Sequence, residues 1–281
     1  MKQDLDRLIK EYGADALWIT GAAQHNPAMV YLTGGAHITG ADLFIRPGQK
    51  PVLYHGMMER DEAAKTGYDL RGYANFPITD YLEKAHGDML EASATRFADM
   101  LKAIGLEKGK VLLYGVVEFS QLFALVKRLA ELMPGLELSG DFDGSILLEA
   151  RATKSADELA HIRHMGQVTT SVVKRVQDYL TAHKVQDETL IKEGGSPLTI
   201  GDVKGLINLW LAEAGAENPE DTIFAIGRDA GVPHSSGTPS DPIQLGRTIV
   251  FDIYPCEAGG GYFYDFTRTW CLGYAPEAVQ K

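Results

Sequence analysis

Two apolar segments near the end of the chain each carry an aspartate, and three consecutive glycines lie between them. The first segment, residues 247–255, reads RTIVFDIYP, and the second, residues 261–270, reads GYFYDFTRTW. Two such segments on either side of a glycine-rich turn predict an antiparallel hairpin. Aspartate is disfavoured in strands and is costly to bury without a partner, so Asp252 and Asp265 need an explanation.

The two arms of this hairpin can bring Asp252 and Asp265 close together. Two carboxylates in one water-poor place repel each other, and one takes up a proton unless a cation lies between them. A divalent metal ion would remove this conflict. Oxygen ligands suit Mn²⁺ or Mg²⁺, and an added imidazole would also suit Zn²⁺, Co²⁺ or Fe²⁺. Alternatively, each aspartate pairs with an arginine such as Arg268, and the spacing alone leaves both interpretations open.

Strands and helices alternate through the first half of the chain, which is typical of an α/β domain. Helices are expected at residues 5–12, 57–67, 90–104 and 119–132, and strands at 14–20 and 110–115. Residues 41–55 are expected to form a hairpin that turns at Pro47-Gly48.

The pattern changes near residue 150, and we place a domain boundary there, giving domains 1–150 and 151–281. Ser155 and Glu158 have the spacing of a capping box, which predicts the start of a long helix. Its expected apolar stripe is Leu159, Ile162, Met165, Thr169, Val172, Val176 and Leu180. Residues 202–215 predict a second helix that ends at a glycine.

The composition is that of a globular protein, since 45% of the 281 residues are hydrophobic and 23% are charged. A net charge of -11 argues against nucleic acid and anionic membrane surfaces as partners. The first residues lack an apolar segment of the secretory type, and no run of about 18 apolar residues occurs, so we expect a cytoplasmic protein. Two cysteines do not make a disulfide framework.

The second arm of the hairpin, GYFYDFTRT, resembles the pita-bread metallopeptidases, which include methionine aminopeptidase, Xaa-Pro aminopeptidase, prolidase and creatinase. Residues 225–237, AIGRDAGVPHSSG, and 147–168, LLEARATKSADELAHIRHMGQV, are similar to further segments of that family. The first half resembles the creatinase-type N-terminal domain. The resemblance implies an α/β creatinase-like N-terminal domain followed by an α+β pita-bread domain, of which the chain holds the first part.

The resemblance also implies roles for individual residues. Asp265 would bridge two divalent metal ions and Asp252 would bind one of them, with Mn favoured and Co, Zn or Fe as alternatives. His234 would lie near the substrate as a catalytic group, although read alone it is an ordinary loop histidine. Thr267 and Thr269 would orient the ligands. The implied activity is hydrolysis of Xaa-Pro bonds at the N-terminus of peptides or in dipeptides, by metal-activated water, in a homodimer.

The sequence departs from the family pattern in two ways. Asp252 and Asp265 are 13 positions apart, slightly more than is usual in the family. An insertion of an even number of residues leaves the side chains of both strands on the same faces of the sheet, because side chains alternate along a strand. The family takes one histidine and two glutamates from chain after the second aspartate, whereas the 16 residues here contain only Glu277. We therefore expect an incomplete form that is inactive alone. The alternatives are an inactive binding module of the same fold and a creatinase-like hydrolase without metal.

Other candidate groups fit a functional site less well. His161 and His164 are three residues apart on a predicted helix, but no H-E-x-x-H glutamate accompanies them. Ser235 directly follows His234, and adjacent residues do not form a serine–base pair. Cys256 is expected at the hairpin tip without a base, so we expect it to be inert.

Overall fold

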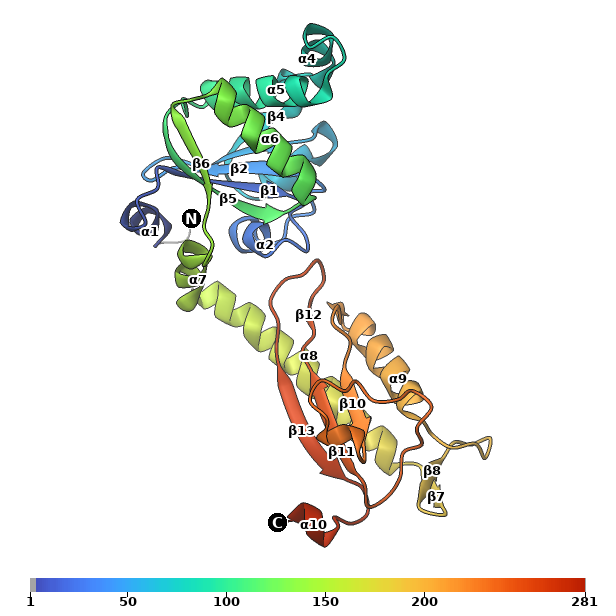
Figure 1. Cartoon of the computed structure of the whole chain (residues 1–281). Coiled ribbons are helices and arrows are strands. Elements are labelled where there is room, and N and C mark those ends of the chain that lie inside the picture. Colours follow the sequence, from blue (N-terminus) through green and yellow to red (C-terminus); the bar gives the residue numbers. More distant parts are fainter. Residues whose placement is uncertain (1–3, 281) are drawn as a thin grey trace. The chain divides into compact units, whose positions relative to one another are not determined.

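The computed structural model describes residues 4–280, which form two compact units (Figure 1). Unit 1 contains residues 4–154 together with Gly259–Gly261, and unit 2 contains residues 155–258 and 262–280. Within unit 1, the backbone amide of His25 donates a hydrogen bond to the carbonyl of Gly259 (2.8 Å). Each unit has its own hydrophobic core, so each is described by itself.

Unit 1 is built on a six-stranded mixed sheet with the strand order β4-β3-β2-β1-β5-β6. The strands are β1 (Ala16–Gly21), β2 (Ala41–Ile45), β3 (Val52–His55), β4 (Asp69–Gly72), β5 (Gly109–Val116) and β6 (Leu136–Gly140). Strand β1 is parallel to β5 and antiparallel to β2. The predicted hairpin forms between β2 and β3, which are antiparallel.

Helices cover both faces of this sheet (Figure 1). One face packs against α1 (Leu5–Glu11), α2 (Pro27–Thr33), α3 (Arg60–Ala64) and α7 (Ser145–Ala152). The other packs against α5 (Met89–Ala103) and α6 (Phe119–Leu132), and α4 (Ile78–Lys84) lies beside α5. Successive residues of β1 serve opposite cores, because Leu17 and Ile19 face one side and Trp18 faces the other.

The helix predicted at residues 57–67 is shorter than expected. A 3₁₀ turn, Met57–Glu59, precedes the five-residue helix α3, and the chain turns at Gly67 with a positive φ. Met58 is fully exposed, and only Ala63 of this segment is buried. The segment therefore lacks the apolar stripe that would hold a longer helix against the sheet.

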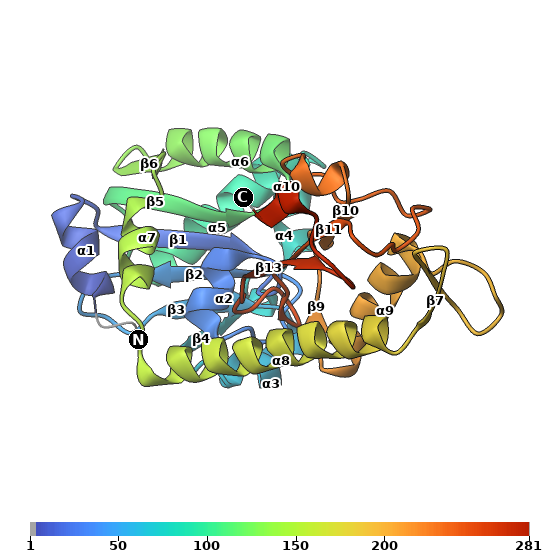
Figure 2. The ribbon, with the colours of Figure 1, turned by 90° about the horizontal axis from the view of Figure 1, so that it is seen from below.

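Unit 2 combines a three-stranded antiparallel sheet with two helices (Figures 1 and 2). The sheet has the order β10-β11-β13, and its strands are β10 (Ile223–Ile226), β11 (Thr248–Ile253) and β13 (Phe266–Cys271). Helices α8 (Ala156–Thr181) and α9 (Ile200–Glu213) pack against one face of it. The remaining elements are β7 (Lys184–Gln186) paired with β8 (Thr189–Ile191), β9 (Ala216–Glu217) paired with β12 (Cys256–Glu257), and α10 (Glu277–Gln280).

The capping box predicted for α8 is present, since Ser155 and Glu158 exchange both of its hydrogen bonds. Five of the seven predicted stripe residues, Met165 to Leu180, are buried as expected. The prediction is wrong for Leu159, which is 38% exposed. The reason is that the contribution of α8 to the core of unit 2 begins only at Met165, two turns into the helix.

The hairpin predicted at the end of the chain is formed by β11 and β13. Ile249, Phe251 and Ile253 alternate along β11 and are buried against the helices. The ring of Phe251 lies edge-on to that of Trp270, with centroids 5.5 Å apart. Because side chains alternate along a strand, Asp252 lies on the other face of the sheet, away from this core.

Within residues 4–280, no helix has both the length and the apolar character that crossing a membrane requires.

Candidate functional site

Asp252 lies near the end of β11, on the face of the sheet that α8 and α9 do not cover. It is paired in register with Ile223 of β10 and with Thr267 of β13. The hydroxyl of Thr267 donates a hydrogen bond to the carboxylate of Asp252 (2.5 Å). Asp252 is half-buried, so the strand pairing fixes its position while leaving the carboxylate open to a ligand.

Asp265 lies one residue before β13 and therefore outside the ladder of paired residues. The last pair of the ladder joins Ile253 to Phe266, and the amide of Tyr264 donates to the carbonyl of Pro255 (3.1 Å). Asp265 is exposed because the hairpin widens into a loop at this point, and its role as a metal ligand stays a prediction.

The hydroxyl of Tyr254 is influenced by the charges of both aspartates. This hydroxyl has a pKa above the usual value, first because it is partly desolvated and then because of nearby negative charges. Those charges come from Glu220, Asp252, Asp221 and Asp265. Both aspartates therefore contribute to the negative charge around the Tyr254 hydroxyl, and their meeting at one metal site stays a prediction.

A hollow of about 310 Å³ opens beside Asp252. Its lining is Ile223, Ala225, Asp229, Ala230, Gly231, Val232, Pro233, His234, Ser235, Val250 and Asp252. His234 and Asp252, which are 18 positions apart in sequence, therefore line the same hollow. His234 lies on an exposed loop and has a φ of 60°, a conformation that is uncommon outside glycine.

Gly237 holds the loop of His234 close to strand β10. Its φ is +83°, and a Cβ at this position would lie 2.3 Å from the carbonyl oxygen of Phe224. Only glycine allows such a close approach of the backbone. The loop that carries His234 is consequently seated on the same sheet that carries Asp252.

The donor chemistry of the two aspartates fits part of a site for a hard divalent cation, since carboxylate oxygens suit Mn²⁺ or Mg²⁺. They do not form a complete site on their own. Among residues 4–280, no three histidine, cysteine, aspartate or glutamate side chains are grouped so that they could hold a metal ion. Asp252 and Asp265 can thus supply two oxygen ligands, and further ligands would have to come from elsewhere.

The alternative that Arg268 neutralises the aspartates finds no support in its contacts. Its guanidinium donates to the backbone carbonyl of Thr267 (2.7 Å) and lies 3.9 Å above the ring of Phe266. Within the part of the chain that the structure describes, no ion pair joins Arg268 to Asp252 or Asp265. The carboxylates therefore keep their capacity to bind a cation.

The other candidates from the sequence differ in their surroundings. Nδ1 of His161 on α8 is 2.6 Å from a carboxylate oxygen of Glu257 on β12, so this histidine has a partner within unit 2. His164 lies on the exposed side of α8. Cys256 is fully buried, so its thiol is not accessible to solvent, and its inertness stays a prediction.

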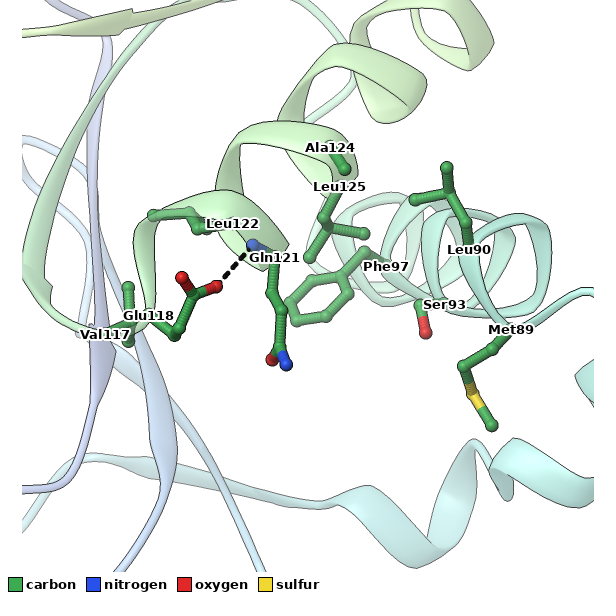
Figure 3. A pocket seen from close by; sticks show the side chains of 10 residues that line it. All are labelled: Met89, Leu90, Ser93, Phe97, Val117, Glu118, Gln121, Leu122, Ala124 and Leu125. Carbon is green, nitrogen blue, oxygen red and sulfur yellow. Dashed lines mark hydrogen bonds between the residues drawn. The ribbon is translucent and has the colours of Figure 1, made fainter.

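A second hollow, which the sequence analysis did not identify, lies between α5 and α6 of unit 1 (Figure 3). Its volume is about 550 Å³, and most of its lining is apolar, including Leu90, Phe97 and Leu125. The carboxylate of Glu118 accepts a hydrogen bond from the amide of Gln121 (2.7 Å), so it serves as a helix cap. This hollow is larger than the one beside Asp252 but offers no comparable group for catalysis.

The chain is similar to known proteins in sequence and in fold. A sequence model of metallopeptidase family M24 matches residues 160–281. A search of curated proteins gave no match.

Solved structures with the same fold were found as well. The prolidase from Pyrococcus furiosus has a TM-score of 0.65 at 16% identity, covering 98% of this chain and 67% of its own. The X-Pro aminopeptidase from Thermotoga maritima MSB8 has a TM-score of 0.70 at 18% identity, and the match covers 99% of this chain and 67% of that protein. The Xaa-Pro dipeptidase from Bacillus anthracis has a TM-score of 0.70 at 15% identity, and the match covers 99% of this chain and 66% of that protein. The chain thus has the fold of about two thirds of each of these proteins.

Proposed function

The chain belongs to metallopeptidase family M24 through its residues 160–281, and from this premise we propose that it forms part of a metal-dependent peptidase. The observation that carries the proposal is that Asp252 and His234 line one hollow, while Asp265 directly precedes the strand that pairs with the strand of Asp252. A family of peptidases implies peptide substrates.

Asp252 and Asp265 would hold the divalent ions, with Asp265 bridging the pair and Mn favoured by the oxygen donors. When bound, such a pair polarises a scissile carbonyl and lowers the pKa of a water molecule. Thr267 orients the Asp252 carboxylate through its hydroxyl, which limits the rotation of that ligand. His234 would donate a hydrogen bond or carry a proton beside the substrate, because it lines the same hollow as Asp252.

The finer proposal is hydrolysis of Xaa-Pro bonds at the N-terminus of peptides or in dipeptides. It is supported by the likeness of fold to proteins described as prolidase, X-Pro aminopeptidase and Xaa-Pro dipeptidase. The lining of the hollow beside Asp252 includes Ile223, Ala225, Val232 and Val250, which could contact an apolar part of a substrate. From the family resemblance alone, we also propose a homodimer.

A catalytically inactive binding module of the same fold is the second candidate. The observation that favours it is that residues 4–280 offer no group of three ligands for a metal ion. A metal-free hydrolase of the creatinase type is less well supported, because this chain has both of the aspartates, Asp252 and Asp265, that the family resemblance identifies as metal ligands.

Metal binding tests the proposal directly on this chain. Mn²⁺ is titrated into the protein and into Asp252→Asn, Asp265→Asn and a matched control, Asp187→Asn, and free Mn²⁺ is measured by electron paramagnetic resonance. Asp187 lies in the turn between β7 and β8, is exposed, and belongs to the same unit. Both site variants should bind Mn²⁺ more weakly than the control, and Asp265→Asn should lose more Mn²⁺ affinity than Asp252→Asn.

Activity separates the two candidate functions. This chain alone is expected not to hydrolyse Xaa-Pro dipeptides or longer Xaa-Pro peptides in the presence of Mn²⁺, because no three possible metal ligands are grouped among its described residues. A protein that contains this chain and the remaining ligands should hydrolyse them. If Mn²⁺ binding is the same in all four proteins, the metal role of both aspartates is wrong and the binding module is favoured.

A further inference from the structure

The position of Asp265 is not explained by strand pairing. The β11–β13 ladder ends at the pair of Ile253 and Phe266, so residues 254–265 leave the sheet and return to it. Loops of this kind are usually mobile, whereas a metal ligand has to be held within a fraction of an ångström. A second set of contacts must therefore fix this part of the hairpin.

Glu257 and Tyr262 close the loop on itself. The amide of Glu257 donates to the carbonyl of Tyr262 (3.1 Å). In return, the amide of Tyr262 donates to a carboxylate oxygen of Glu257, also at 3.1 Å. The two residues thus hold the outgoing and returning arms together at a point beyond the ladder.

The same two residues are anchored to the first turns of α8. The second carboxylate oxygen of Glu257 lies 2.6 Å from Nδ1 of His161. The rings of His161 and Tyr262 stack, with centroids 5.3 Å apart and an interplanar angle of 23°. The hydroxyl of Tyr262 donates to Oε1 of Glu158 (3.0 Å).

Glu158 is a rigid attachment point for this contact. It is 4% exposed, and its other oxygen accepts the amide of Ser155 (2.8 Å) as part of the capping box. One carboxylate therefore both caps the helix and receives the tyrosine. Because a capped helix end does not fray, the contact ties the hairpin to a fixed part of unit 2.

The contact continues from Tyr262 to Asp265. Phe263 forms an isolated bridge to Cys256, and the amide of Tyr264 donates to Pro255 (3.1 Å). The residue after Tyr264 is Asp265. The backbone that carries this aspartate is thus held between the ladder on one side and the α8 contact on the other.

We propose that Glu158, His161, Glu257 and Tyr262 form a latch that positions Asp265 beside Asp252. The four residues are positioning residues, because none of them lines the hollow of His234. The role of the latch in metal binding rests on the proposed function, whereas its role in holding the hairpin does not.

Hydrogen exchange measured at single amides by NMR tests the latch. The variants are Tyr262→Phe, which removes the bond to Glu158 but keeps the ring, and Glu257→Gln, which keeps the shape and removes the charge. The control is His164→Gln, on the same helix and exposed. Loss of one such hydrogen bond should speed exchange at the amides of Glu257, Tyr262 and Tyr264 by about 5- to 10-fold.

A local effect distinguishes positioning from general loss of stability. Amides of β11 and β13 inside the ladder should exchange at the parent rate in both variants, and His164→Gln should match the parent everywhere. Unchanged exchange at Tyr262 and Tyr264 in both variants would overturn the latch. Faster exchange spread evenly over the ladder would overturn it too, because the contact would then only stabilise unit 2.

Mn²⁺ titration of the same variants separates the latch from the proposed function. If both variants and Asp265→Asn weaken Mn²⁺ binding, the latch positions a metal ligand. If local exchange rises while Asp265→Asn binds Mn²⁺ as the parent does, the latch holds the hairpin, but the metal role of Asp265 fails.

Discussion

Replacing Gly166 by alanine should reveal how tightly α8 packs against the hairpin. Gly166 lies in the middle of α8, where alanine is favoured over glycine by about 0.5–1 kcal/mol. A Cβ at this position would lie 2.8 Å from one carbon of the Tyr264 ring and 3.2 Å from two others. Such overpacking typically costs about 1–3 kcal/mol. The net result should be a loss of about 0–2.5 kcal/mol in the free energy of unfolding.

Gly205→Ala provides the matched control. Gly205 lies inside α9 of the same unit, and a Cβ there would meet no atom within 4 Å. Only the helix preference of alanine over glycine applies here, so the free energy of unfolding of this variant should rise by about 0.5–1 kcal/mol. The two substitutions are chemically identical, and the difference between them isolates the contact with Tyr264.

Urea unfolding followed by tryptophan fluorescence measures both variants, since Trp210 and Trp270 belong to unit 2. A third variant, Tyr264→Leu, removes the ring that obstructs the new methyl group. In that background, Gly166→Ala should cost less than in the parent. The reasoning is refuted if Gly166→Ala stabilises the parent as much as Gly205→Ala does.

Three further predictions concern the site and its support. In a protein with a complete metal site, His234→Ala should bind metal normally and lose about 100-fold or more in kcat; an unchanged kcat would exclude a catalytic role, and loss of metal would make His234 a ligand. Thr267→Val should weaken Mn²⁺ binding by this chain. In the Asp252→Asn background the same substitution should leave Mn²⁺ binding unchanged, because the carboxylate that Thr267 orients is already gone. Equal weakening of Mn²⁺ binding in the two backgrounds would contradict this role of Thr267. The pKa of Asp202 is lowered by the hydrogen bond from Lys192 and by hydrogen bonds from Thr199. The stability that Asp202 contributes is therefore present above the pKa that it has in the unfolded chain, and it is lost as the pH falls through the lower pKa of the folded protein. Asp202→Asn should flatten this acid limb in unfolding measured against pH, and an identical limb would show that other carboxylates produce it.

Local patterns predicted the elements that carry the site. The capping box of Ser155 and Glu158 and the alternation around Asp252 both depend on neighbouring residues, and both are present in the structure. The apolar stripe of α8 was predicted less well, since periodicity does not tell where the packed core ends. Leu159 has the correct spacing but lies beyond it.

Contacts between distant segments were not predictable from one sequence. His161 was considered as a metal ligand, and its partner Glu257 is 96 positions away. No local signal links a helix start to a hairpin loop. The exposure of Asp265 has a similar origin, because the alternation of the second arm does not show at which residue the two strands separate.

The sheet of unit 2 ends in β13, which is hydrogen-bonded to β11 on one side only within the described residues. An edge strand offers a row of backbone donors and acceptors that a strand from another molecule can extend. The charged side chain of Arg268 and the exposed hydroxyls of Thr267 and Thr269 make such growth less favourable. Neutralising Arg268 would remove one of these protections, so solubility and chemistry both constrain the six residues of β13.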